Sequence, residues 1–351
     1  MHRRAFSETF IRQHVARLPF KVSYAWGAYL GYGLNDTELL PEWRARLPFL
    51  GEIALQDKWV ATIKKQNVKL VLAEYGPVGV HWLPVCQKAG IPLLVYFHGF
   101  DATRGDIVRQ YKLKYKELFK FASSIFVVSE PMRQLLLSWG APESKLVLNP
   151  CGADSSMFRY QERDSSQQTV LSVGRFAATK RPDLVIKAFT QVLKDMPKAQ
   201  LRMAGAGEML KECKALVSKL GLNSQVHFIG VLTPEQVVHE MHEANVFVQH
   251  SMTTPDGETE GAPVAIMEAG ATGLPVVSTI HAGIPEIVEH DKTGYLVPEG
   301  DTEGMAQYLV KLLQNGTLAN QMGLAASQRI AAHFSVEQNI RILTQTIEKH
   351  L

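Results

Sequence analysis

The stretch TVLSVGRFAATKRP, residues 169–182, carries the pattern that decides the fold. A short run rich in β-branched and apolar residues ends in a glycine and an arginine, and a second basic pair and a proline then open a helical segment. A buried strand followed by a helix is the unit of parallel sheets that carry helices on both faces. Ligands of such sheets bind beyond the carboxyl ends of the strands, so chemistry is expected in the residues after Val173.

The same unit recurs along the chain. Runs of this kind in the first half are VKLVLAEYG (68–76), IPLLVYFHG (91–99), SSIFVVS (123–129) and KLVLNPCG (145–152). Those in the second half are TVLSVGR (169–175), AQLRMAG (199–205), QVHFIG (225–230), ANVFVQHS (244–251) and LPVVST (274–279). The polar stretch 160–168 separates the two series, so the sequence predicts an α/β protein with two Rossmann-like β/α/β domains, 1–160 and 161–335.

Size and composition agree with two globular domains. The chain of 351 residues exceeds the ~250 to 300 residues at which one core usually stops growing. Apolar residues make up 46% of the chain, and no apolar run approaches the ~18 residues that a membrane span needs. Three cysteines, Cys86, Cys151 and Cys213, are too few for a disulfide framework or a cysteine-rich zinc site. We therefore expect a cytoplasmic protein with buried thiols.

The net charge of +3 conceals an asymmetry between the halves. Residues 1–160 hold 21 Lys+Arg against 13 Asp+Glu, whereas residues 161–351 hold 16 against 21. The two domains are thus expected to meet different partners, and an anionic surface would be met by the first.

A second stretch, ETEGAPVAIMEAG (258–270), places two carboxylates around one predicted helix. Pro263 suits the first turn of a helix that runs to about Thr272, so Glu260 lies in the loop before it, at the carboxyl end of a strand. Amides at the helix N-terminus can stabilise an anion, while Glu268 lies among apolar residues, where a carboxylate needs a partner. The alternatives are an ordinary loop acid at Glu260 and a structural hydrogen bond at Glu268.

Two cations and two glycines follow the strands nearby. Arg175 and Lys180 would suit a pyrophosphate, although a solvated basic loop gives the same pattern. Gly205, in AGAGE, and Gly230 would let the backbone approach a ligand, or would simply allow tight turns. Together with the carboxylates and the helix amides, these groups match the sugar hydroxyls, the diphosphate and the ribose of a nucleotide sugar.

Residues 168–300 resemble the C-terminal domain of the retaining glycosyltransferases of family 4. These enzymes have the GT-B fold, two Rossmann-like domains facing across a deep cleft, and act in bacterial exopolysaccharide, colanic-acid-like or lipopolysaccharide assembly. The resemblance rests on the segments VGRFAATKRPDLVIKAF, AQLRMAGAGE, VHFIGVL, ANVFVQHS, EGAPVAIMEAGATGLPVVST and GIPEIVEHDKTGYLV, in this order and spacing.

The resemblance implies roles for the residues named above. Arg175 and Lys180 would hold the donor diphosphate, Glu260 would contact the donor sugar, and Glu268 would bind the ribose. Further donor-binding positions implied are Gly205, Gly230, Val231, Gly261, Ala262 and Pro263. No metal and no cofactor would be needed, since cations and helix amides offset the charge of the leaving diphosphate.

The first half resembles the family more loosely. The segment YFHGFD (96–101) resembles the one whose histidine lies over the donor sugar, which makes His98 a candidate catalytic residue; a structural hydrogen bond is the alternative. SETFIRQHV (7–15) resembles the first helix of the family, with Ser7 as its cap, but the strand and the glycine-containing loop expected before it are missing. Residues 336–351 resemble the closing helix that crosses back to the N-terminal domain.

The segment RGDIVRQYKLKYKELFKF (104–121) reads as a cationic amphipathic helix with aromatic and apolar residues interleaved. Charge runs of this kind are usually solvated. The alternative hypothesis is peripheral attachment to the anionic inner leaflet, where a lipid-linked acceptor would be met.

Three functions remain open from the sequence. The leading one is transfer of a sugar, with retention, from a UDP-sugar or GDP-mannose to a glycan or lipid-linked saccharide along a front-face path. A same-fold sugar-nucleotide epimerase would need no acceptor, and a non-catalytic partner subunit would bind nucleotide without turnover. A nicotinamide-dependent oxidoreductase is disfavoured because no strand is followed by G-x-G-x-x-G with an acidic residue ~20 positions on, and no nucleic-acid partner is expected.

Overall fold

The computed structural model describes residues 9–27, 29–35, 37–41, 50–163 and 167–351. The chain divides into two compact units. The first unit is Met1–Pro150 together with Gln338–Leu351, and the second unit is Cys151–Glu337. The division falls ten residues before the predicted boundary at 160/161, because Phe158 already packs in the core of the second unit.

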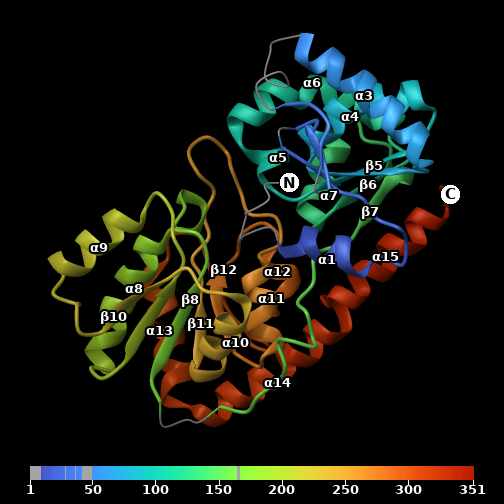
Figure 1. Ribbon diagram of the computed structural model, residues 1–351. Coiled ribbons are helices and arrows are strands. Elements are labelled where there is room, and N and C mark those ends of the chain that lie inside the picture. The colour runs from blue at the N-terminus through green and yellow to red at the C-terminus, as the bar shows by residue number, and fades with distance from the viewer. Residues whose placement is uncertain (1–8, 28, 36, 42–49, 164–166) are drawn as a thin grey trace. The chain divides into compact units, whose positions relative to one another are not determined.

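The first unit is built on a parallel sheet in the order β4-β5-β6-β7 (Figure 1). Its strands are β4 (Val71–Glu74), β5 (Leu93–Phe97), β6 (Ser124–Val127) and β7 (Leu146–Leu148). Its helices are α1 (Thr9–Arg17), α3 (Leu50–Gln66), α4 (Gly76–Ala89), α5 (Phe100–Thr103), α6 (Gly105–Phe121), α7 (Glu130–Ser138) and α15 (Val336–Glu348), with a 3₁₀ turn η1 (Glu143–Lys145). All residues of β5 are buried, as expected of a central strand covered on both faces.

A small antiparallel sheet and a cavity lie beside this parallel sheet. The small sheet consists of β1 (Ala25–Trp26), β2 (Gly33–Leu34) and β3 (Thr37–Glu38). Within the described residues β4 pairs only with β5, and a mainly apolar cavity of about 910 Å³ lies against β4, α1 and α3. The predicted helix at 7–15 is α1, while its predicted cap, Ser7, lies outside the described residues.

The second unit is a six-stranded parallel sheet in the order β10-β9-β8-β11-β12-β13. Its strands are β8 (Thr169–Val173), β9 (Gln200–Ala204), β10 (Val226–Gly230), β11 (Val246–Val248), β12 (Val276–Thr279) and β13 (Gly294–Val297). Its helices are α8 (Pro182–Asp195), α9 (Leu210–Lys219), α10 (Pro234–Glu243), α11 (Val264–Ala271), α12 (Ile284–Ile287), α13 (Thr302–Gln314) and α14 (Gly316–His333), with a 3₁₀ turn η2 (Ala178–Lys180).

Alternation along the strands divides the core of the second unit into two clusters. Val170 packs on the face covered by α8, α9 and α13, whereas the next residue, Leu171, packs on the face covered by α10 and α11 (Figure 1). Val248 and Phe247 of β11 are divided in the same way. Successive side chains of a strand point to opposite faces, so these short apolar runs cover both sides of the sheet, and the predicted α/β fold is confirmed.

All nine predicted strands are present, although shorter at their ends. Sequence reasoning missed β13 and the three two-residue strands of the small sheet. In the part of the chain that the structure describes, no helix is both long and apolar enough to cross a bilayer.

Candidate active site

Three glycines end adjacent strands of the second unit and lock their turns together. The Gly174 N–H donates to the Ala204 carbonyl at 3.0 Å, and the Gly205 N–H donates to the Gly230 carbonyl at 2.7 Å. Gly205 has φ +132°, and a Cβ there would lie 1.9 Å from the Gly174 oxygen. Gly205 is therefore required by backbone packing, whereas Gly230, at φ +77°, faces open space.

An ion pair lies beyond these strand ends. Lys180 Nζ is 3.1 Å from Glu260 Oε1, and both side chains are largely buried, at 15% and 14% exposure. Burial alone would raise the pKa of Glu260, but the Lys180 ammonium, with the Arg175 guanidinium, holds it below its usual value. The structure thus brings together Arg175, Lys180 and Glu260, as the sequence predicted, and keeps Glu260 ionised.

The side chain of His281 accepts a hydrogen bond from the backbone of Glu260. The Glu260 N–H donates to His281 Nε2 at 3.0 Å, so the proton of the neutral ring is on Nδ1, which lies 2.6 Å from Glu299 Oε1. Glu299 also accepts from the Thr253 N–H and hydroxyl. Sequence reasoning missed His281 and Glu299; each lies two residues after a strand, where the strand-end rule would find it.

Helix α11 begins beside this pair. Pro263 is the N-cap residue, one position before the first helical residue rather than within the first turn as predicted, and the helix ends at Ala271. Gly261 is buried, and its carbonyl accepts from the Gly283 N–H at 3.1 Å. Gly261, Ala262 and Pro263 therefore form the entrance of the helix next to Glu260.

Glu268 lies on α11 and is half-buried. Among the described residues its carboxyl accepts no hydrogen bond, and burial raises its pKa to about 8. The structural hydrogen bond considered for Glu268 from the sequence is therefore not made by the described residues. A half-buried carboxyl group that accepts no hydrogen bond from the described residues suits a ligand that supplies hydroxyl donors.

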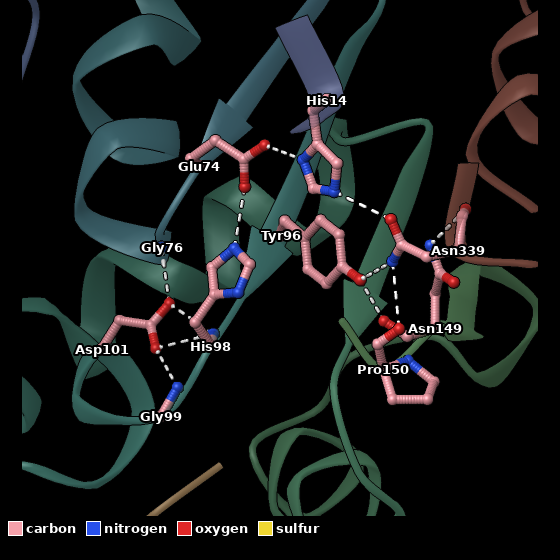
Figure 2. Close-up of polar contacts among 10 residues, drawn as sticks. All are labelled: His14, Glu74, Gly76, Tyr96, His98, Gly99, Asp101, Asn149, Pro150 and Asn339. Carbon is pink, nitrogen blue, oxygen red and sulfur yellow. Dashed lines mark hydrogen bonds and ion pairs between the residues drawn. The ribbon is translucent and has the colours of Figure 1, made fainter. Parts of the chain in front are cut away.

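In the first unit, His98 follows β5 and is held at its backbone by Asp101 (Figure 2). The buried Asp101 carboxylate accepts N–H groups from His98 at 3.0 Å, Gly99 at 2.8 Å and Gly76 at 3.0 Å. These bonds tie the turns after β4 and β5 together. His98 is thus fixed at the carboxyl ends of two adjacent strands, where the sequence placed it.

The ring of His98 is held by Glu74, which ends β4. Glu74 Oε2 lies 2.8 Å from His98 Nε2, and Glu74 Oε1 lies 2.7 Å from His14 Nδ1 (Figure 2). Sequence reasoning singled out neither Glu74 nor His14. Glu74 could have been found as a polar residue at a strand end, but His14 is 60 residues away on α1, and no local pattern relates the two.

The apolar side of the cationic helix α6 is part of the core of the first unit. Its buried residues are Ile107, Tyr111, Tyr115, Leu118 and Phe119. The predicted amphipathic helix is thus present, and because its apolar face packs in the core, these side chains are not available to a membrane. The basic side chains stay exposed; they are Arg109, Lys112, Lys114, Lys116 and Lys120.

No group of three or more histidine, cysteine, aspartate or glutamate residues arranged to hold a metal is found among the described residues. The polar groups gathered in the second unit are instead a carboxylate between cations, a helix entrance and an unpaired acid. They can bind an anion and several hydroxyls.

Comparison with known proteins identifies the family. The model for glycosyl transferases group 1 matches residues 155–329, and the model for glycosyltransferase family 4 matches residues 31–156. The chain belongs to the family 4 glycosyltransferases.

Relatives and solved structures agree with this assignment. The amylovoran biosynthesis glycosyltransferase AmsK of Erwinia amylovora is 32% identical over 72% of this chain and 63% of its own length. The putative colanic acid biosynthesis glycosyltransferase WcaL of Escherichia coli K12 is 32% identical over 70% of this chain and 62% of its own length. The match thus spans less than two thirds of these relatives.

The fold is GT-B. The structure of Anabaena Alr3699/HepE in complex with UDP has a TM-score of 0.73 at 20% identity, covering 86% of this chain and 84% of that chain. Sucrose-phosphate synthase from Thermosynechococcus elongatus has a TM-score of 0.72 at 22% identity, covering 86% and 80%.

Proposed function

We propose that the protein is a retaining glycosyltransferase that moves a sugar from a nucleoside diphosphate to a glycan or lipid-linked saccharide without a metal. The observation that carries the proposal is the Lys180–Glu260 pair beside Arg175, at the entrance of α11. A carboxylate kept ionised between cations can accept hydroxyls of a sugar, while the cations bind the phosphates next to it.

Each part of the donor has a counterpart in the second unit. Arg175, which is exposed, and Lys180 bind the diphosphate, and the amides at the start of α11 add to that charge stabilisation. Glu260 binds the transferred sugar, and Glu268 binds the ribose hydroxyls. The base lies against Gly230 and Val231, whose side chain is 56% exposed.

In the reaction we propose, His98 contacts the transferred sugar. The acceptor hydroxyl attacks the anomeric carbon from the face that the phosphate leaves, its proton passes to the leaving phosphate oxygen, and the configuration is retained. The names of the two relatives, one for amylovoran and one for colanic acid biosynthesis, support a role in exopolysaccharide assembly.

Calorimetric titration without metal tests the donor site. We expect one of UDP and GDP to bind to the wild-type protein, and we expect Glu268→Ala to weaken that binding by about tenfold, because a pair of hydroxyl–carboxylate hydrogen bonds is lost. Incubation with the matching nucleotide sugar and product analysis then separates transfer from epimerisation. Binding of neither nucleotide would contradict the proposal.

The pH dependence of that binding tests the role of Glu268. Burial raises the pKa of Glu268 to about 8 in the free protein, and ribose hydroxyls favour the ionised form. Nucleotide binding therefore releases a proton, and the affinity rises by roughly fivefold between pH 7 and pH 8.5, above the range in which the phosphate titrates. Glu268→Gln should remove this rise; an equal rise in that variant would show that another group titrates.

Vesicle flotation tests the surface of α6. We propose that its exposed cations attach the protein peripherally to an anionic leaflet. The double variant Lys112→Gln/Lys116→Gln should weaken binding to phosphatidylserine vesicles about tenfold or more, since each cation contributes ~1 kcal/mol at such a surface. The matched control is Lys194→Gln/Lys198→Gln, two exposed lysines of the second unit. Equal losses in both variants, or binding that ignores anionic lipid, would contradict the attachment.

A further inference from the structure

The cluster around His98 contains hydrogen bonds whose directions can be assigned one by one (Figure 2). Asn339, on α15, donates from Nδ2 to the Pro150 carbonyl at 3.0 Å and to the Tyr96 hydroxyl at 2.9 Å. Tyr96 in turn donates its hydroxyl proton to the Asn149 carbonyl. Because a carbonyl can only accept, the amide nitrogen of Asn339 must face Pro150, and its oxygen must face His14.

The charge of His14 follows from these directions. His14 Nε2 lies 2.9 Å from Asn339 Oδ1, so this nitrogen donates. His14 Nδ1 lies 2.7 Å from Glu74 Oε1, and an ionised carboxylate only accepts, so this nitrogen donates as well. Both ring nitrogens therefore carry protons, and His14, at 3% exposure, is a buried imidazolium paired with Glu74.

The pKa shifts of His14 and Glu74 both favour the charged forms that the hydrogen bonds assign. Burial lowers the pKa of His14, but the Glu74 carboxylate outweighs burial and raises it above the usual value. Burial raises the pKa of Glu74, yet His14 and His98 lower it to about 2. Glu74 thus remains an anion in a buried place because a cation lies on one of its oxygens.

The second oxygen of Glu74 determines the state of His98. Glu74 Oε2, 2.8 Å from His98 Nε2, accepts a proton from that nitrogen. The His98 ring is stacked on Tyr96 and tilted against Phe10, each with a centroid distance of 4.3 Å. The His98 ring cannot turn without breaking these contacts. Its Nε2–H is therefore directed at Glu74, and the opposite edge of the ring keeps one orientation.

We propose that Glu74 is a positioning residue that fixes the tautomer and orientation of His98, and that the imidazolium of His14 keeps Glu74 ionised and in place. The proposal rests on the proposed function, in which His98 contacts the transferred sugar. A histidine whose partner is fixed offers the same hydrogen-bonding edge to every substrate molecule, which lowers the cost of ordering it in the transition state.

Nuclear magnetic resonance tests the charge states without any turnover. Long-range ¹H–¹⁵N correlation on protein labelled at its 12 histidines reports the protons of each ring, with His14→Gln and His98→Asn assigning the signals. At about pH 7 we expect His14 to be protonated on both nitrogens and His98 to carry a proton on Nε2. A neutral His14, or a His98 protonated on Nδ1 alone, would overturn the proposal.

Kinetics with the donor found by calorimetry test the consequence. Glu74→Gln should lower kcat by roughly 10- to 100-fold and leave the donor dissociation constant within about twofold, because the group that binds the nucleotide is in the other unit. If Glu74→Gln does not fold, His14→Gln/Glu74→Gln removes both charges together and should show the same loss of kcat. An unchanged kcat in the folded variant would overturn the proposal.

Glu52 provides a matched control. Its carboxylate lies 2.9 Å from His81 Nδ1 in the same unit, but it is exposed and lies outside the His98 cluster. Glu52→Gln should leave kcat within about twofold of wild type, and a loss equal to that of Glu74→Gln would make the effect non-specific and count against the proposal. If the wild-type protein shows no transfer at all, the proposed function fails, while the histidine signals still decide the charge states.

Discussion

Replacement of Lys180 with alanine is expected to lower kcat/KM by about 10²- to 10³-fold, the loss found when one fixed charge-stabilising group is removed from a transition state. Lys180 has two functions in the proposed site. It neutralises Glu260 at 3.1 Å, and it offsets the charge that develops on the leaving diphosphate. Without it, Glu260 stays largely buried with the Arg175 guanidinium to favour its ionised form, and its charge repels the phosphates.

The measurement is nucleotide release from the donor, together with the dissociation constant of the nucleoside diphosphate. Lys187→Ala is the matched control, since Lys187 is another ion-paired lysine of the second unit, 3.6 Å from Asp183 and half exposed. The control should stay within about twofold of wild type. A loss of less than about threefold in Lys180→Ala would show that this lysine does not contact the diphosphate.

The pairing of Lys180 with Glu260 could be predicted because both residues follow strands of one parallel sheet. The carboxyl ends of β8 and β11 lie side by side in that sheet, so residues 80 positions apart meet there. The rule that site residues follow the carboxyl ends of parallel strands requires only the positions of the strands. Apolar runs bounded by glycine and polar residues identify those positions well.

The missed strand of the second unit, β13, lacks this signal. β13 (Gly294–Val297) is four residues long and begins with glycine, which is unfavourable in strands. The structure explains the glycine, because a Cβ at Gly294 would lie 2.2 Å from the Val276 carbonyl oxygen on β12. In the sequence, Gly294 is only a weak strand former. The reason for glycine at this position is the close approach of the β12 and β13 backbones, which the sequence does not reveal. Glu299 was missed with the strand that it follows.

The cluster around Glu74 could not be predicted for a different reason. Its bonds join α1, β4 and α15, and the bond from His14 to Asn339 spans 325 residues. These contacts depend on where two helices pack, and periodicity gives the face of a helix but not its neighbour. The family resemblance supplied His98 alone.

The domain boundary was placed too late because a polar segment was interpreted as a linker. Residues 151–163 belong to the second unit, and Arg163, at 7% exposure, is among its buried charged residues. Its Nη1 donates to the His242 carbonyl at 3.1 Å and its Nη2 to the Thr272 carbonyl at 2.5 Å. These carbonyls end α10 and α11, so one guanidinium caps two helix C-termini, where a cation is stabilised by the helix dipoles.

Arg163→Met should therefore destabilise the second unit strongly. Burial lowers the pKa of Arg163 to about 10, so it is charged at neutral pH. Its removal takes a charged donor from both carbonyls, and the Thr272 carbonyl keeps only the Gln161 N–H, at 3.1 Å, among the described backbone donors. We expect the free energy of unfolding of that unit to fall by about 3 kcal/mol, with Tm lower by roughly 6–12 °C. Arg159→Met, an exposed arginine of the same segment, is the control and should change Tm little.

The two units can be followed separately in the intact chain. Every tryptophan of the sequence lies before residue 150, so tryptophan fluorescence reports the first unit, and calorimetry reports both. Arg163→Met should lower the temperature of the calorimetric transition of the second unit, which tryptophan fluorescence does not report. Well below that transition its affinity for nucleotide should stay within about twofold of wild type, because the Lys180–Glu260 pair lies at the entrance of α11, at the opposite end of the helix from the carbonyl that Arg163 caps. A shift of the fluorescence transition instead, or a loss of affinity in the folded variant, would show that Arg163 acts beyond the stability of α10 and α11.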